Sequence, residues 1–179
     1  MFEKIKQHYP PWLELIPILL LLIAVYYTTS HYTQLPSRIP THFGPSGNPD
    51  SWSTKGFWSV YLSLVIGAGV WLSLALTNYF LIIKPEDPGK YINLTKKQKE
   101  KLGPDGLEAI RHLTACAMIL INFTTVALIV ALQDGTINTA LGTQKGLSYA
   151  VDILAGALIF EALWLTIKTL SMTLPPKER

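Results

Sequence analysis

Residues 35–55 read LPSRIPTHFGPSGNPDSWSTK and separate two long apolar runs. Four of the twelve prolines of the chain and two closely spaced glycines fall within this segment, which excludes a helix. The segment also holds a histidine, a carboxylate, a lysine and a tryptophan. A merely solvated connector is more often built of serine, glycine and lysine. We therefore expect a structured loop, over residues 31–56, that carries function.

The first two prolines of this segment push the residue before each of them toward an extended conformation. The sequences GPSG and NP that follow are turn signals. We expect residues 39–43 to run extended and the chain then to reverse, which brings Asp50 and Trp52 back beside His42. This cluster has two interpretations, a ligand site or a set of side chains that hydrogen-bond the loop's own backbone and anchor it at the membrane surface.

Candidate ligand-binding residues in the first interpretation combine polar, charged and aromatic side chains. They are His42, Phe43, Asn48, Asp50, Trp52, Lys55 and, from a later apolar run, Asp152. The histidines and carboxylates of the loop lack the tight spacing of a zinc site, so we predict no metal and no cofactor. No nucleophile elbow, phosphate-binding glycine loop, CxxC pair or HExxH helix occurs, and we assign no catalytic residue.

The composition around the loop indicates a membrane protein. Of the 179 residues 49 % are hydrophobic and 15 % are charged, against about 25 % charged in soluble domains. We predict an all-α integral membrane protein with a single membrane domain over residues 1–179 and four transmembrane helices. The predicted spans are about 12–30, 57–83, 110–132 and 147–170, each near the length needed to cross a bilayer. The net charge of +3 is too small to indicate nucleic acid binding.

The connections between the spans carry their own signals. Residues 84–109 form a polar loop, in which Thr95 with Gln98 and Asp105 with Glu108 match capping boxes of a short helix ending at Gly103 and of the next long helix. Residues 133–146 read as a short loop that turns at an Asp-Gly pair. In the second span, a serine-serine-glycine line at four-residue spacing is typical of close helix packing in lipid and could supply a homodimer contact.

The distribution of basic residues predicts the orientation in the membrane. Twelve of the fifteen lysines and arginines fall in the N-terminus, residues 84–109 with their flanks, and the C-terminal end, which includes Lys177 and Arg179. Only three fall in the other two connections. Basic loops stay in the cytoplasm, so we predict a multi-pass protein of a prokaryotic cell membrane with both termini cytoplasmic and residues 31–56 outside. A cleaved signal peptide is the rival for the first span, but the small-residue cleavage pattern is missing.

Two carboxylates lie within predicted spans, where an acid is costly and by default marks function. We expect Asp152 to face the bundle beneath the loop, because it shares a helical line with a serine and a glycine. Glu161 lies near mid-depth on the opposite side of the helix. It could be a protonated carboxyl bonded to Asn122, Thr124 or Thr125, or a proton-titrating or cation-contacting group lining a cavity.

The loop resembles the signature of a family of bacterial and archaeal membrane proteins classed as a domain of unknown function. The family pattern is LP-x-x-IP, then HF or HW, a G-x-P-D turn, an aromatic residue or glycine, and a lysine. The residues that carry it here are Leu35, Pro36, Ile39, Pro40, His42, Phe43, Gly47, Pro49, Asp50 and Lys55. The pattern occurs in the N-terminal part of the toxin-immunity protein SdpI. The resemblance therefore implies a membrane protein with an outward-facing loop and, as a hypothesis, immunity or signalling.

These observations leave several function classes open. The first is an envelope binding or sensing protein whose outer loop recognises a peptide, a toxin or a lipid headgroup. The second is a small homodimeric transporter, or a transporter subunit, that uses the intramembrane carboxylates. A metal-dependent membrane enzyme and a scaffold for a larger complex are the remaining classes. In each of them membrane lipids are the surrounding partner.

Overall fold

The structure is a computed structural model that describes residues 1–173. It is mainly helical, and four of its helices are long and apolar enough to cross a membrane, as predicted. The candidate spans are Pro11–Gln34, Phe57–Ile83, Lys96–Ala140 and Tyr149–Thr173. Lys177 and Arg179, which the prediction of a cytoplasmic C-terminus uses, lie outside the described residues. The protein is therefore a multi-pass membrane protein.

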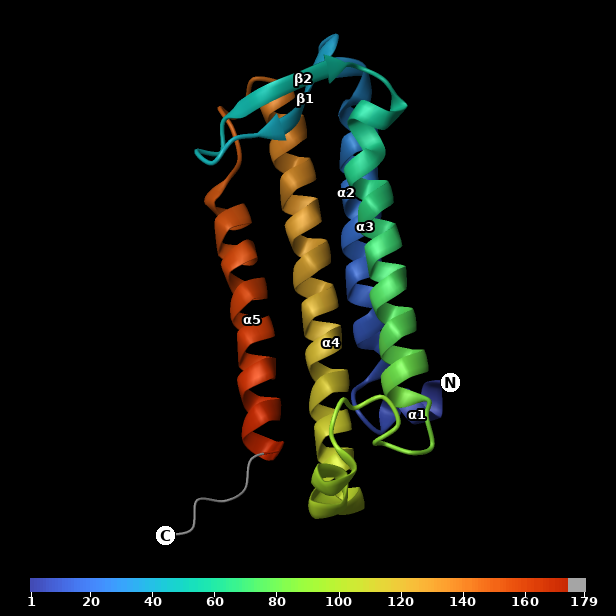
Figure 1. The fold of residues 1–179 in the computed structure, drawn as a ribbon. Helices are drawn as coiled ribbons and strands as arrows, with labels where there is room; N and C mark the ends of the chain where they lie inside the picture. Colours follow the sequence, from blue (N-terminus) through green and yellow to red (C-terminus); the bar gives the residue numbers. More distant parts are fainter. Residues whose placement is uncertain (174–179) are drawn as a thin grey trace.

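The helices run side by side, and a small hairpin lies across one end of them (Figure 1). The α-helices are α1 (Phe2–Lys6), α2 (Leu15–His31), α3 (Phe57–Thr77), α4 (Lys96–Ala140) and α5 (Tyr149–Thr173). Short 3-10 turns, η1 (Pro11–Glu14) and η2 (Tyr32–Gln34), flank α2, and a π-helical turn, η3 (Asn78–Ile83), ends α3. The hairpin strands are β1 (Arg38–Phe43) and β2 (Pro49–Thr54). We call the two ends of the bundle the hairpin end and the loop end, the latter formed by α1 and residues 84–95.

Helix α4 is the centre of the bundle. It packs against α2, α3 and α5, and among the described elements α5 packs extensively against α4 alone. Helix α5 therefore stands apart from α2 and α3 in Figure 1. Consistent with this position, none of its residues is fully buried. The faces of α5 that turn away from α4 are left to lipid or to another partner.

The loop-end start of α4 follows the sequence prediction in part. Thr95 caps the helix through its side chain and Gln98 completes the capping box. Gly103, at φ 66° and ψ 177°, breaks the helix at the predicted place, in a conformation that favours glycine. The second predicted box is wrong, because the chain resumes its helix at Pro104 and Asp105 already lies in the first turn.

The hairpin-end part of α4 corrects a second prediction. Residues 133–140 are helical, so the loop predicted over 133–146 begins only after Ala140 and the Asp-Gly pair makes no turn. Tertiary packing explains the difference: a Cβ on Gly135 would come within 2.7 Å of Leu147, which lies over the glycine. Asp134 in turn accepts a hydrogen bond from Asn138, one helical turn later, at 2.9 Å.

The small-residue line of α3 is used inside the chain. A Cβ on Gly67 would lie 3.0 Å from Ile129 of α4 and 3.2 Å from Leu21 of α2. Ser63 donates a hydrogen bond to Gln133 of α4, and Ser59 accepts from the Gly56 amide at the start of α3. The predicted close packing is therefore present, but between α3 and its neighbours. These residues therefore pack within the chain, and the homodimer that the sequence suggested stays a prediction.

Candidate functional site

The proline- and glycine-rich segment forms the antiparallel hairpin β1–β2, which corresponds to the predicted extended path and reversal. The turn follows from its residues: the Gly44 carbonyl accepts from the Gly47 amide at 2.9 Å, and Gly47 has φ 74°. Proline in the second position and glycine in the fourth position of such a turn are the favoured choices. The register shifts between Pro40 and Phe43, which re-aims the side chains at the tip of β1.

His42 and Asp50 meet across the hairpin, as the sequence predicted. The imidazole Nδ1 lies 2.6 Å from a carboxylate oxygen of Asp50, and the two side chains are 68 % and 50 % exposed. A carboxylate at Nδ1 selects the tautomer that carries its proton there and fixes the ring orientation. Nε2 has no hydrogen-bond partner within residues 1–173, so it is available to a ligand. In an exposed setting the pair itself adds little stability.

The other predicted hairpin residues do not converge on this pair. Lys55 donates to the Leu35 carbonyl at 2.9 Å and lies 4.7 Å above the Tyr32 ring, so it closes the base of the hairpin. Trp52 lies opposite Pro40 and is 41 % exposed. The remaining two predicted residues sit near the turn, Phe43 half-buried and Asn48 exposed with its amide on Ser46.

Asp152 does not lie where the sequence placed it. Its side chain is exposed, and it makes no hydrogen bond or ion pair with any residue from 1 to 173. A Cβ on Gly156, one turn further along the same line, would meet nothing within 4 Å. This line of α5 therefore faces away from α4. The hairpin instead contacts the chain before α5, where the Leu147 amide donates to the Gly47 carbonyl at 2.8 Å.

Beneath the hairpin lies a hollow that the sequence reasoning missed, and we call it the hairpin groove. It has a volume of about 500 Å³ and is walled by β1, β2, α3 and α4. Its lining residues are Pro40, Thr41, Ser53, Trp58, Ser59, Leu62, Ser63, Ile66, Gln133 and Thr136. Hydroxyl groups and apolar side chains share the walls, and no charged side chain is among them.

Gln133 fixes the inner wall of the hairpin groove. It is 2 % exposed, and its amide nitrogen donates to the Thr28 hydroxyl at 3.0 Å and to the Val60 carbonyl at 2.9 Å. Its carbonyl accepts from Ser63. One side chain of α4 thus ties α2 and α3 together at this depth. The serines of the second span indicate close packing on this face of α3, but the predicted loop over residues 133–146 does not lead to Gln133 as their partner.

The intramembrane acid Glu161 lies between α5 and α4. The Thr124 hydroxyl donates to one of its oxygens at 2.8 Å, which selects Thr124 among the three predicted partners. Asn122 is on the opposite face of α4, where its amide donates to the Trp71 carbonyl of α3 at 3.3 Å. The second oxygen of Glu161 is buried and has no partner in the described part of the chain.

At the loop end, Cys116 and two histidines lie close together, a cluster that sequence spacing did not show. The ring centroids of His8 and His112 are 5.6 Å apart, and the Cys116 thiol donates to the His8 carbonyl at 3.3 Å. Burial lowers the pKa of His8. Across residues 1–173, no three histidine, cysteine or acidic side chains are placed to hold a metal ion. The described residues therefore offer no three-ligand centre for the metal-enzyme hypothesis.

The fold and the site together define a helical multi-pass membrane protein with a hairpin-capped groove at one end. Residues 19–74 match a family described as "Domain of unknown function (DUF1648)". The match covers most of α2, the hairpin and most of α3, so it includes the His42–Asp50 pair but not Gln133. No curated protein and no solved structure matches the chain.

Proposed function

We propose that this protein resides in the cell membrane of a prokaryote with both termini in the cytoplasm and the hairpin outside. The distribution of basic residues supports this orientation, because the loop end carries most of the lysines. In a variant with Cys116→Ser, a cysteine placed at Ser46 in the hairpin turn should react with a membrane-impermeant maleimide on intact cells. A cysteine at Lys97, at the loop end, should react only after lysis. The opposite labelling pattern would reverse the orientation.

The function that the geometry supports best is binding or sensing of an envelope ligand at the hairpin. The observation that carries the proposal is the hairpin groove, a polar hollow roofed by the same strands that display the His42–Asp50 pair. A hollow with a few placed polar groups among apolar walls is the usual form of a small-ligand site. Ligands of this kind include a peptide, a toxin or a lipid headgroup, as in SdpI-like immunity or signalling.

The lining of the groove narrows the chemistry of the ligand. Trp58, Leu62 and Ile66 provide an apolar wall on α3, and hydroxyls such as that of Thr136 provide donors and acceptors. Because the lining includes no charged side chain, the inserted group should be uncharged and able to hydrogen-bond. The free Nε2 of His42 would add one polar contact on the hairpin itself.

Thermal stability of the purified protein in detergent tests this proposal. A ligand present at about 100 times its Kd stabilises the native state by about 2.7 kcal/mol, which raises Tm by roughly 5–10 °C. Envelope peptides, lipid headgroups and divalent metals are the ligands to scan. We expect the shift to be lost in Thr136→Phe, which fills the groove, and reduced in His42→Ala and Asp50→Ala.

Thr125→Phe is the matched control, because both threonines are half-buried on α4 and donate to the carbonyl four residues earlier, and Thr125 is not among the residues that line the hairpin groove. The control should keep the full ligand shift. If no ligand shifts wild type and the hairpin variants are merely less stable, the hairpin is a determinant of the fold and the binding proposal is wrong.

A second candidate, proton-coupled transport, rests on a different observation. Glu161 places a buried oxygen at mid-depth that has no partner among the described residues, and an acid within a span by default marks function. Flux in proteoliposomes that depends on pH and is abolished by Glu161→Gln would support it. Flux that neither pH nor this substitution changes would contradict it.

A further inference from the structure

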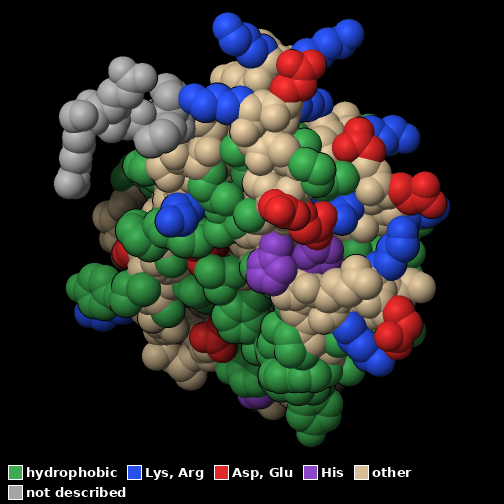
Figure 2. Space-filling view, turned by 90° about the horizontal axis from the view of Figure 1, so that it is seen from below, with side chains coloured by type: hydrophobic (Ala, Val, Ile, Leu, Met, Phe, Trp, Pro, Cys, Tyr) green, Lys and Arg blue, Asp and Glu red, His purple; other side chains and the backbone are tan. Residues whose placement is uncertain are grey.

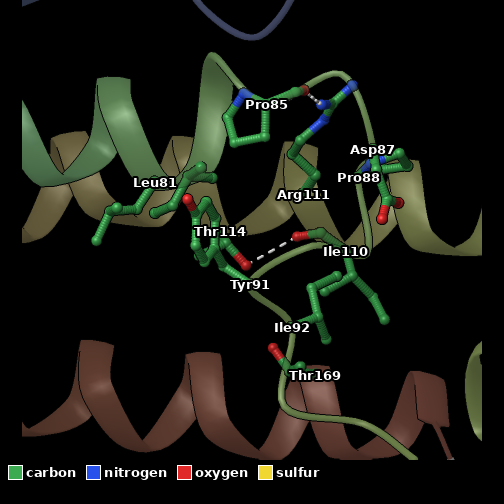
Figure 3. A pocket seen from close by; sticks show the side chains of 11 residues that line it. Leu81, Pro85, Asp87, Pro88, Tyr91, Ile92, Ile110, Arg111, Thr114 and Thr169 are labelled. Atoms are coloured by element: carbon green, nitrogen blue, oxygen red, sulfur yellow. Dashed lines mark hydrogen bonds between the residues drawn. The ribbon is translucent and has the colours of Figure 1, made fainter. Parts of the chain in front are cut away.

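The loop end contains a hollow that belongs to neither proposed site. It has a volume of about 190 Å³ and lies at the junction of η3, residues 84–95, α4 and α5. Most of its wall is apolar, and its polar members are Asp87, Tyr91, Arg111, Thr114 and Thr169 (Figure 3). We call this hollow the neck. It lies at the level where the polar start of α4 gives way to its apolar run, which is the depth of a membrane interface.

Two further hollows share residues with the neck. One runs along α4 and α5 and shares Thr114 and Thr169 with it; we call this one the side groove, and its other residues include Leu165 and Leu170. The other shares Leu81, Pro85 and Tyr91 with the neck and is lined by three lysines, so we call it the lysine rim. The three hollows thus adjoin one another, with the neck between the apolar side groove and the basic lysine rim. We call this series of adjoining hollows the path.

Among the described residues, the lysine rim carries positive charge that no ion pair neutralises. Its basic residues are Lys4, Lys84 and Lys90, and none of them forms an ion pair among the described residues. Lys84 and Lys90 instead lie over the aromatic rings of Phe80 and Tyr91, at 5.0 and 5.3 Å. From this end, charged side chains crowd one part of the face and hydrophobic surface occupies another (Figure 2).

Carboxylates are present beside these lysines, and two of the three are already engaged. Glu108 pairs with Arg111, and Asp87 accepts from the Gly89 amide at 2.8 Å. Glu86 lines the lysine rim and opposes the lysines there. The rim itself therefore keeps an excess of positive charge.

Arg111 supplies an unused donor in the neck. Its side chain is 15 % exposed, and its two terminal nitrogens bond the Pro85 carbonyl and Glu108. Its Nε is buried and has no acceptor within residues 1–173. A buried donor without an acceptor is costly, and a small shift of the guanidinium toward the neck would let a phosphate or ester oxygen there accept from it.

We propose that this path binds one anionic phospholipid, with an acyl chain in the side groove, the glycerol ester region in the neck and the phosphate-bearing headgroup at the lysine rim. A lipid matches the sequence of chemistries along the path: apolar wall, hydroxyls and an arginine donor, then lysines. Basic pockets between transmembrane helices are suited to anionic headgroups. This inference does not depend on the proposed ligand of the hairpin groove.

Native mass spectrometry of the full chain, titrated with phosphatidylglycerol or phosphatidylcholine, tests the proposal. We expect one phosphatidylglycerol to bind wild type more tightly than phosphatidylcholine. Lys84→Gln with Lys90→Gln should weaken phosphatidylglycerol binding roughly 10- to 30-fold, and Glu86→Gln should strengthen it about 5-fold. Thr169→Phe, which fills the neck without changing charge, should remove the bound lipid.

Matched controls make the same changes of charge and size at residues away from the path. Lys96→Gln with Lys97→Gln and Glu100→Gln repeat the charge changes on exposed residues at the same end. Ile167→Phe repeats the added bulk on a side chain of α5 that is 66 % exposed. All three should leave binding within about 2-fold of wild type, and the Tm of each variant reports whether it is folded.

Several outcomes would overturn the proposal. Equal affinity for the two lipids would show that the headgroup charge is not recognised. An equal loss of affinity in the rim double variant and in the control lysine double variant would show that only the general surface potential attracts the lipid. If folded Thr169→Phe protein still binds the lipid, the lipid does not pass through the neck. Displacement of the lipid by soluble glycerol phosphate at a similar concentration would make the rim a site for a soluble anion instead.

Discussion

The hairpin end and the loop end of the bundle use their backbone and side chains in opposite ways. At the hairpin end, two strands satisfy each other's backbone groups, and the buried cluster of Leu35, Ile39, Val60 and Ile137 fastens them to the helices. At the loop end, residues 84–95 have no partner strand and are held by single bonds, such as Lys99 to the Gly89 carbonyl at 2.6 Å. Strand pairing holds the backbone at the hairpin end, whereas separate hydrogen bonds hold it at the loop end.

This difference shows where each end leaves room for a ligand. The hairpin end encloses a groove with uncharged polar walls, because its lining among the described residues includes hydroxyl and amide side chains but no charged one. The loop end leaves three adjoining hollows and several lysines without an ion pair among the described residues. Lysines without an ion pair among the described residues thus line a hollow at the loop end, where the packing is interrupted.

The largest expected effect tests the packing of the hairpin end. Ile39 is fully buried, at 0 % exposed, so Ile39→Ala should lower the free energy of unfolding by about 3 kcal/mol through lost contacts and a residual cavity. Ile159→Ala, at a side chain that is 64 % exposed on α5, should cost less than about 1 kcal/mol in detergent. Chemical denaturation measures both. Similar losses for the two variants would mean that the hairpin is not fastened by this cluster.

The contact between the hairpin turn and the chain before α5 should give the next largest effect. A Cβ on Gly146 would lie 2.3 Å from the Gly47 carbonyl oxygen, so Gly146→Ala must move the backbone and should cost about 2 kcal/mol. Gly69→Ala, where a Cβ meets nothing within 4 Å, should not destabilise the protein. The test is a comparison of Tm values. A Gly146→Ala protein as stable as wild type would show that the turn and α5 are not coupled.

Lys55 sharpens the contrast between a bonded lysine and a free one. Lys55→Met removes a hydrogen bond to the Leu35 carbonyl and a cation–π contact with Tyr32, with an expected cost of about 1–2 kcal/mol. Lys145→Met, at an exposed lysine, should change stability by less than about 0.5 kcal/mol. If both substitutions change stability by the same small amount, Lys55 does not stabilise the fold and the ligand-binding role that the sequence suggested is favoured.

The smallest expected effect is a pH dependence at the loop end. Burial lowers the pKa of His8 below its usual 6.5, so the unfolded chain binds a proton that the folded chain resists. Stability should therefore fall as the pH drops through about 6.5 toward the lowered value, by roughly 1–3 °C in Tm between pH 7 and pH 5. His8→Asn should reduce this slope. A slope unchanged in His8→Asn would place the titration elsewhere.

The candidate site was predictable where its residues are close in sequence. Two prolines, the GPSG turn and an eight-residue separation bring His42 beside Asp50, because a short hairpin leaves few alternative registers. The same reasoning failed for Asp152 and Gln133, which belong to helices far along the chain. Their orientation depends on which neighbour each helix packs against, and helical periodicity alone cannot choose that neighbour.

The sequence by itself determined the four spans, the break at Gly103 and the reversal of the hairpin, because hydropathy, glycine and proline act locally on the backbone. Tertiary structure alone decided that α4 lies at the centre, that the helix continues past Asp134, and that hollows open under the hairpin and beside Arg111. These features arise from packing between helices, since lipid makes every apolar face equally acceptable. Which faces meet is settled by shape and by a few hydrogen bonds, such as those of Gln133.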